Sequence, residues 1–215
     1  MAKDDPYIPA LGRDWLTPLY DPLQRWVMRE DQFKRHLIRQ AQIEPGHGVL
    51  DLGCGTGTLT ILIKQTHPQS DVVGLDGDPM ILAIARAKAA KAGVEISLDH
   101  GMAFQTPYPD QAFERVLSSL VLHHLTSENK QRTLREAFRV LRPGGELHVV
   151  DLGKPHTVWA RLISRFMQRF EETADNFKGL LPAMFRQAGF DGVAETARYA
   201  TLFGTLSLYQ GRKPG

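Results

Sequence analysis

Three glycines at alternate positions give this sequence its clearest chemical signal. Gly53, Gly55 and Gly57 follow an apolar run that contains one acid, Asp51. Glycine tolerates a positive φ and lets a ligand approach the backbone closely. Residues 49–60 therefore predict a buried strand, then a tight turn against a ligand, and then the start of a helix.

A second acid stands where the next predicted strand ends. Asp76 closes the apolar run 72–75, and it lies 21 positions after Gly55. Ligands of doubly wound sheets bind outside the carboxyl ends of the strands, and an acid at about this spacing binds the ribose of a nucleoside cofactor. We therefore expect Asp76 to accept hydrogen bonds from both ribose hydroxyls.

The spacing of the glycines distinguishes between two classes of cofactor. A dinucleotide fingerprint, Gly-x-Gly-x-x-Gly, would need a third glycine where this chain has Thr58. No basic side chain follows the turn to hold a phosphate. S-adenosylmethionine (SAM) has no pyrophosphate, and its amino and carboxylate groups can meet the turn backbone and Asp51. SAM is therefore the expected cofactor, and an NAD(P)-binding oxidoreductase is the alternative.

Two adjacent histidines and one tyrosine are candidates for the chemistry of transfer. His123 and His124 follow the fourth predicted strand toward the same edge, and histidine can act as a base near neutral pH. The alternative is that both histidines cap the next helix or pack under the cofactor. Tyr20 can hydrogen-bond the cofactor or the acceptor, or it can be a packing aromatic. We name His124 and Tyr20 as the candidate catalytic residues.

The composition argues against several other classes of protein. The 215 residues carry a net charge of +2, which gives no indication of a nucleic-acid partner. The single cysteine, Cys54, excludes an internal disulfide and a cysteine-based metal cage, and we interpret it as a small residue that fits the turn. No apolar run approaches the ~18 residues of a spanning helix, and the first residues lack a signal-peptide core. We expect a cytoplasmic protein without a bound metal.

Strands and helices alternate along most of the chain. The sequence predicts strands at 49–52, 71–76, 94–98, 113–119 and 146–151, and helices between them at about 57–66, 81–92 and 127–141. Such alternation predicts a doubly wound, Rossmann-like α/β sheet. Two helices, at about 156–170 and 177–188, and two strands, at 192–199 and 201–209, complete the prediction. The short link between the last two strands predicts an antiparallel pair in a seven-stranded, mostly parallel sheet.

We interpret the chain as one domain over residues 1–215, because no linker, repeat or low-complexity segment interrupts it. The expected parts are an N-terminal cap and helix (1–42), a cofactor-binding core (43–151), and acceptor-side helices with the C-terminal strands (152–215). Recognition of the acceptor is then left to residues 1–20 and 152–190.

Five segments, in order, resemble the motifs of one known family, the class I SAM-dependent methyltransferases. Residues 49–60 resemble its motif I, 73–80 its strand-two motif, 107–116 its "LPFPDxSFDxV" segment, 122–125 its "LHHL" segment and 139–145 its "RVLKPGG" segment. The resemblance covers about residues 43–151. It is strongest to the small methyltransferases of the ubiquinone/menaquinone-biosynthesis type.

The resemblance implies a role for each residue of the expected cofactor site. Gly53 and Gly55 would lie under the methionine part of SAM, and Gly57 would let the following helix pack closely. Asp76 would hold the ribose. The other implied cofactor-binding residues are Asp51, Cys54, Gly77, Met102, Ala103 and Ser119.

One position departs from the family pattern. Relatives usually have Gly-Asp-Ala at the loop that borders the adenine, and their acid reaches the adenine amino group. This chain has Gly101-Met102-Ala103. Recognition of the amino group would then depend on backbone or water, with Met102 packed on the ring.

The predicted helix 156–170 bears on the acceptor. Its apolar residues fall on one face and three arginines, Arg161, Arg165 and Arg169, fall on another. Such a helix can lie on an anionic membrane or pack on the protein. An apolar face there suits a small, hydrophobic or lipid-like acceptor. Besides the methyltransferase, a SAM-binding protein without catalytic activity is a further alternative.

Overall fold

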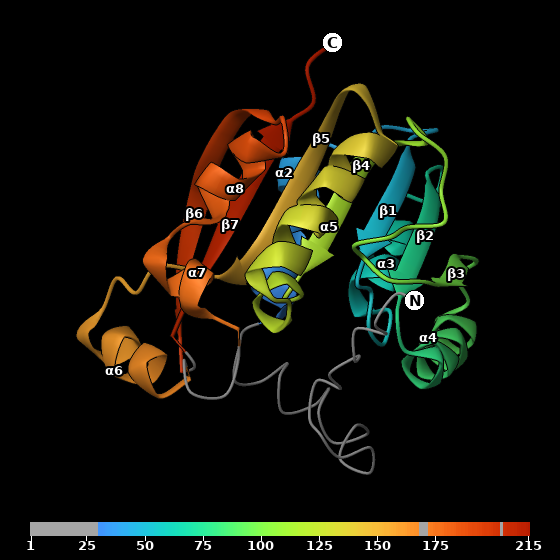
Figure 1. The fold of residues 1–215 in the computed structure, drawn as a ribbon. Coiled ribbons are helices and arrows are strands. Elements are labelled where there is room, and N and C mark those ends of the chain that lie inside the picture. The colour runs from blue at the N-terminus through green and yellow to red at the C-terminus, as the bar shows by residue number, and fades with distance from the viewer. Residues whose placement is uncertain (1–29, 168–171, 203) are drawn as a thin grey trace, which may run out of the picture.

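The computed structural model describes residues 30–167, 172–202 and 204–215, and it places seven strands in one sheet (Figure 1). The order across the sheet is β3-β2-β1-β4-β5-β7-β6. The strands are β1 (Gly48–Leu52), β2 (Asp71–Asp76), β3 (Ser97–His100), β4 (Phe113–Ser119), β5 (Leu141–Leu152), β6 (Asp191–Thr201) and β7 (Gly204–Arg212). The first five are parallel, and β7 pairs antiparallel with both β5 and β6. The predicted Rossmann-like, mostly parallel sheet with an antiparallel C-terminal pair is confirmed.

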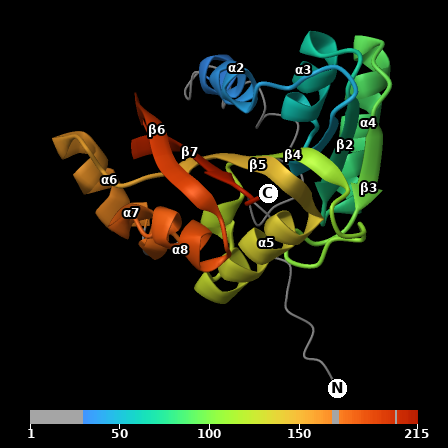
Figure 2. The same cartoon turned by 90° about the horizontal axis from the view of Figure 1, so that it is seen from above.

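Helices cover both faces of the sheet. They are α2 (Glu30–Ala41), α3 (Thr58–Thr66), α4 (Pro79–Ala92), the 3₁₀ turn η2 (Leu122–His124), α5 (Ser127–Val140), α6 (Val158–Met167), α7 (Ala174–Lys178) and α8 (Leu181–Gln187). Seen from above, α2, α3 and α4 lie on one side of the sheet, and α5, α7 and α8 lie on the other (Figure 2). Helix α6 stands at the end of the molecule beside the β6–β7 pair.

Two hydrophobic clusters hold these layers together. One includes Phe33 and Leu37 of α2 and the buried side chains that β1 and β5 direct to the same face. The other includes Leu134 and Ala137 of α5, Phe185 of α8, and side chains from the opposite face of the sheet. In the part of the chain that the structure describes, no helix is long and apolar enough to cross a membrane. The cytoplasmic location stays a prediction.

Local signals account for the best-predicted helix. Asp78 caps α4, because its side chain accepts hydrogen bonds from the backbone N–H groups of Met80 and Ile81. Pro79 occupies the first turn, where a missing N–H costs nothing, and Gly93 ends the helix with a φ of +66°. The helix therefore begins and ends at residues that the sequence already marks.

The acceptor-side region differs from the prediction. The single helix expected at 177–188 is two short helices, α7 and α8, because Gly179 adopts a φ of +73° and ends α7. The described part of the helix expected at 156–170 is α6, Val158–Met167. Strand β6 runs on to Thr201, so the chain reverses after that residue rather than at it.

Two other strand boundaries also differ. The edge strand expected at 94–98 is Ser97–His100, since pairing with β2 begins only at Ser97. Residues 142–145, where a turn is expected, belong to β5, which begins at Leu141: the partners of β4 pass from Leu141 directly to Glu146, so the four residues bulge out of the ladder with β4. The carboxyl ends of β1, β2 and β4, where the expected site lies, fall where the sequence predicts them.

Candidate functional site

The glycine turn lies at the point where the strand order reverses. Strand β1 has β2 on one side and β4 on the other, and the turn leaves the carboxyl end of β1. Gly53, Gly55 and Gly57 have φ values of +76°, +54° and +74°. The backbone would be strained at these values if the residue carried a side chain. This is the position at which open α/β sheets bind ligands.

Close packing beneath the turn requires the first of these glycines. A Cβ at Gly53 would lie 2.4 Å from Cγ2 of Val121, in the segment that follows β4. The backbone N–H groups of Gly53 and Cys54 both donate to the carbonyl oxygen of Leu75 in β2. A Cβ at Gly55, in contrast, would meet no atom within 4 Å. The turn is therefore held from below and open at Gly55.

The two carboxylate oxygens of Asp51 differ in their hydrogen bonding within the described residues. Its side chain is buried, and its Oδ2 accepts a hydrogen bond from the Thr60 hydroxyl at 2.6 Å. Its Oδ1 has no hydrogen-bond partner among the described residues. Burial raises the pKa of Asp51 to about 6, although the Thr60 hydrogen bond and the Lys34 charge lower it. A cationic donor, such as an amino group, would satisfy Oδ1.

Asp76 is fixed by two backbone donors at the end of β2. The N–H of Gly55 donates to Oδ2 at 2.8 Å, and the N–H of Asp78 donates to Oδ1 at 3.0 Å. Burial raises the pKa of Asp76, and these backbone hydrogen bonds lower it in part. Each carboxylate oxygen can accept a second hydrogen bond, so Asp76 is positioned to receive a diol. Gly77 follows, and its carbonyl oxygen lies 3.1 Å from Nε2 of His100.

The loop from β3 to β4 carries Met102 and Ala103, both half-buried. The N–H of Gln105 donates to the carbonyl oxygen of Met102 at 3.0 Å, and Ala103 packs against the hydrophobic cluster on the α5 side of the sheet. Because position 102 is a methionine, it offers no carboxylate to the amino group of an adenine.

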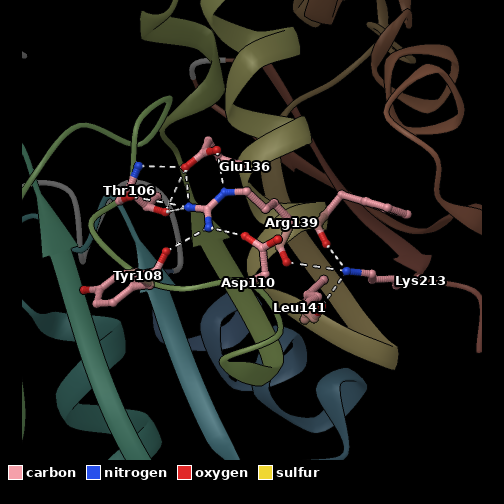
Figure 3. Close-up of polar contacts among 8 residues, drawn as sticks. Thr106, Tyr108, Asp110, Glu136, Arg139, Leu141 and Lys213 are labelled. Carbon is pink, nitrogen blue, oxygen red and sulfur yellow. Dashed lines mark hydrogen bonds and ion pairs between the residues drawn. The ribbon is translucent and has the colours of Figure 1, made fainter.

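Arg139 of α5 holds this loop in place (Figure 3). Its guanidinium donates to Glu136 on the same helix, to Asp110, and to the carbonyl oxygen of Tyr108. It also donates to the hydroxyl of Thr106, whose N–H and hydroxyl in turn donate to Glu136. These contacts connect the loop to a helix that packs on the sheet. They therefore support the segment that would border an adenine.

The end of β4 and the segment after it bring Ser119 and the two histidines to the same edge. The Oγ of Ser119 is buried and has no hydrogen-bond partner in the described ranges. Leu120 has a φ of +62°, which is unusual for a non-glycine residue and redirects the chain into η2. Nδ1 of His123 lies 2.8 Å from Oδ1 of Asp151, at the end of β5. His124 packs against His123 with ring centroids 3.9 Å apart.

Sequence reasoning missed three residues near this edge. Lys88 of α4 lies against the turn, with Nζ 2.6 Å from the Thr58 hydroxyl and 3.1 Å from the Thr56 hydroxyl. A basic side chain therefore does reach the turn, from a helix rather than from the residues that follow it. Asp151 and Asn176 were also missed, and only their contacts in the fold reveal them.

Two expected site residues need separate mention. Tyr20 lies outside the described residues. Cys54 is buried, and its Sγ would lie 2.9 Å from a Cβ placed at Gly74. Burial raises the pKa of the Cys54 thiol, and the nearby Asp51 and Asp76 raise it further. Its role as a small packing residue agrees with this environment. No cluster of three or more His, Cys, Asp or Glu side chains able to hold a metal was found in the described part of the chain.

The residues at this edge fit SAM. Three backbone positions admit only glycine without strain, and two buried oxygens, Oδ1 of Asp51 and Oγ of Ser119, lack partners among the described residues. A fixed carboxylate, Asp76, stands one strand away. An amino group and a ribose are the ligand groups that such acceptors bind.

Comparison with known proteins agrees with this geometry. Residues 49–145 match the model of a methyltransferase domain family. The demethylmenaquinone methyltransferase of Thermus thermophilus is 30% identical over 223 residues, which cover 93% of this chain and 98% of that protein. The enzyme of the same name from Symbiobacterium thermophilum is 29% identical, over 93% of this chain and 90% of its own length.

Solved structures share the fold. The SAM-dependent methyltransferase SibL superposes with a TM-score of 0.73 at 24% identity, over 97% of this chain and 60% of SibL. The YcgJ protein of Bacillus subtilis superposes with a TM-score of 0.70 at 18% identity, over 85% of this chain and 98% of its own. The oxidoreductase alternative is therefore not retained. The chain belongs to the class I SAM-dependent methyltransferases and is an enzyme of that family.

Proposed function

We propose that this methyltransferase transfers the methyl group of SAM to a small, lipid-like acceptor of the quinone type. The observation that carries the site assignment is the pair of acids at the switch point, Asp51 with its unsatisfied Oδ1 and Asp76 with its fixed carboxylate. The acceptor class rests on the relatives named demethylmenaquinone methyltransferase, of which one is covered over 98% of its length.

The cofactor is assigned to the carboxyl edge of β1, β2 and β4. Asp51 would accept from the amino group of SAM and Asp76 from the ribose hydroxyls. The remaining residues proposed to bind the cofactor are Gly53, Cys54, Gly55, Gly77, Met102, Ala103 and Ser119. The sulfonium of bound SAM supplies an already activated methyl group. The protein's own contribution is then to position the acceptor and to exclude water.

The acceptor is assigned to the side of the site formed by η2 and the helices after β5. His123 and His124 lie there on η2, and Asn176 of α7 reaches the end of β5. Tyr20, which lies outside the described residues, is retained as a proposed acceptor-side group. A base is needed only where the acceptor must lose a proton before it takes the methyl group.

A membrane contact of α6 would suit such an acceptor. Val158, Trp159, Leu162 and Leu202 are each more than half exposed, and the indole N–H of Trp159 donates to the carbonyl oxygen of Leu202. These four residues form the α6 patch. Two exposed basic residues, Lys154 and Arg161, lie close to this patch in the sequence. Apolar and cationic side chains together suit the surface of an anionic bilayer.

Methyl transfer from labelled SAM to a reduced, short-tailed demethylmenaquinone tests the acceptor. We expect a labelled product whose mass is that of the acceptor plus one methyl group. Asp76→Ala should lower the amount of product by about 10-fold or more at low SAM concentration. Binding of S-adenosylhomocysteine without transfer to this acceptor would overturn the acceptor assignment. A screen of cell extract with labelled SAM would then identify the true one.

Co-sedimentation with phospholipid vesicles tests the membrane contact separately. We expect the chain to bind vesicles that contain anionic lipid, and the double variant Trp159→Ala, Leu162→Ala to lose this binding. Replacement of two apolar residues elsewhere on the surface, Met80 and Ile84, serves as the matched control. Equal sedimentation of the α6 variant and the control would refute a contact through the α6 patch.

A further inference from the structure

Asp151, at the side of the site proposed for the acceptor, is a buried acid surrounded by several hydrogen-bond donors. It is fully buried at the end of β5. Its Oδ2 accepts from the N–H of Leu122 at 2.7 Å, and its Oδ1 accepts from the N–H of Leu152 at 2.7 Å and from Nδ2 of Asn176 at 3.1 Å. Nδ1 of His123 is a further neighbour of Oδ1.

These donors determine the protonation of the acid. Burial alone would raise the pKa of Asp151, but the charge and hydrogen bond of His123 and the backbone donor at Leu152 outweigh it and lower the pKa. Asp151 is therefore a carboxylate at neutral pH. A carboxylate has only acceptor atoms, so the Nδ1 of His123 must carry the hydrogen in the 2.8 Å contact.

The tautomer of His123 follows. In a neutral imidazole with a hydrogen on Nδ1, the basic lone pair is on Nε2. The His123 ring is nearly buried, and η2 places it where β4 ends, at the edge of the sheet that carries the glycine turn. A carboxylate on one nitrogen orients the ring and stabilises the imidazolium that forms when the other nitrogen takes a proton.

The neighbouring histidine has a different environment. His124 packs against His123 with the two rings tilted by 43°, and no carboxylate is bonded to it in the residues described. Burial, and next the charge of His123, lower the pKa of His124 to about 3, although Asp151 opposes this in part. A nitrogen with so low a pKa is a weak proton acceptor at neutral pH. Of the two histidines, His123 is thus the better base.

Two helices, α7 and α5, hold the pair formed by His123 and Asp151 in place. Asn176 is fully buried on α7 and donates to both Oδ1 of Asp151 and the carbonyl oxygen of Leu152. The buried Lys130 of α5 binds the carbonyl oxygen of Glu172 and lies 3.3 Å from Asp175, which anchors the start of α7. Of the described residues, Asp151 from β5 and His124 from η2 are titratable groups that contact His123. From α7, the neutral amide of Asn176 contacts Asp151.

We propose that His123 is the general base of the reaction and that Asp151 and Asn176 are its positioning residues. This rests on the proposed function, for an acceptor that carries a hydroxyl. The O–H bond of the acceptor breaks, its electron pair stays on the acceptor, and Nε2 of His123 takes the proton. As an oxygen or ring carbon of the acceptor bonds to the methyl group, the methyl–sulfur bond breaks and its electrons remain on sulfur. Where a ring carbon is methylated, its C–H bond then breaks and that proton restores the hydroxyl of the acceptor. The imidazolium later returns its proton to water.

NMR of the imidazole nitrogens in the labelled wild-type chain tests the pair without any reaction. We expect His123 to hold its hydrogen on Nδ1, and Asp151→Asn to change that tautomer and lower the pKa of His123, since the carboxylate favours the imidazolium. A wild-type His123 with its hydrogen on Nε2 would overturn the proposal even if methyl transfer proceeds.

Turnover provides the second test. With saturating SAM and the reduced short-tailed demethylmenaquinone, His123→Gln should lower kcat by about 100-fold or more, the usual contribution of a general base. His124→Gln should lower it less, and His47→Gln, at the opposite end of β1, serves as the control. Each variant must bind S-adenosylhomocysteine as the wild type does.

The pH profile separates a base from a structural histidine. Wild-type kcat should rise with pH to a plateau as His123 loses its proton, and Asp151→Asn should move this rise to lower pH. Wild-type kcat in a folded His123→Gln variant, or a rise unmoved in Asp151→Asn, would overturn the proposal. If the wild type transfers no methyl group to this acceptor, the acceptor assignment of the proposed function is refuted. The NMR result still shows whether His123 carries its hydrogen on Nδ1, toward Asp151.

Discussion

Replacement of Asp51 by asparagine should change how the stability of the ligand-free protein depends on pH. Burial raises the pKa of this carboxyl from 3.8 to about 6 in the folded chain. Since each pKa unit corresponds to ~1.4 kcal/mol, ionised Asp51 costs the folded state about 3 kcal/mol. Asparagine has nothing to ionise, and its amide oxygen can still accept the Thr60 hydroxyl.

The sign of the effect follows from the order in which the two states lose the proton. As pH rises from about 4, the unfolded chain loses the Asp51 proton first, while the folded chain keeps it until about pH 6. The wild type should therefore lose about 3 kcal/mol of unfolding free energy relative to Asp51→Asn between pH 4 and pH 6. Above about pH 6 the difference should stay constant.

Urea titrations of both proteins at several pH values from 4 to 8 measure this difference directly, because the other titrating groups are common to both. Thr60→Val provides a check on the cause. It removes the hydrogen bond that lowers the pKa of Asp51, so the pH range over which the unfolding free energy falls should extend to higher pH. Parallel curves for wild type and Asp51→Asn over the whole range would refute the argument that burial keeps this acid protonated.

Three further changes test other parts of the site. Asp76→Ala should weaken S-adenosylhomocysteine binding by about 10-fold or more, because a charged acceptor is lost, and an unchanged Kd in calorimetry would contradict the ribose assignment. Gly53→Ala should cost about 2–5 kcal/mol, from backbone strain and from the clash with Val121. The double variant Gly53→Ala, Val121→Ala should recover part of that unfolding free energy. If urea titrations show that the losses of the two single variants simply add, the contact between these residues is contradicted. Arg139→Lys should lower the unfolding free energy by about 1–3 kcal/mol and speed amide exchange at Thr106. Unchanged exchange would show that the loop stays ordered without the Arg139 contacts.

The parts of the fold that depend on neighbours in sequence were predictable. The glycines at 53, 55 and 57 and the acid at the end of each of the first two strands stand within short segments, so periodicity and turn chemistry were enough to identify them. The Asp78-Pro79 start and the Gly93 stop of α4 are local in the same way. The structure bears out the fold class, while the roles of the individual site residues stay predictions.

The remainder depends on contacts between distant residues. His123, Asp151 and Asn176 lie 28 and 25 positions apart in sequence and meet only because β4 and β5 are adjacent and α7 crosses the end of β5. Lys88 reaches the turn from a helix 30 residues away. Gly179 is a local signal too: this glycine ends α7, although it lies inside the single helix that the sequence predicts at 177–188.

The single cysteine gives the chain a built-in chemical probe of its own ligand site. Cys54 is the only thiol in the sequence, and it is buried within the glycine turn. Because alkylating reagents attack the thiolate, a buried thiol whose pKa is raised reacts only when the turn opens. The rate of alkylation therefore reports how often this turn departs from its closed state, without any engineered label. Ligands that bind across the turn can then be ranked by how far they slow a single covalent modification.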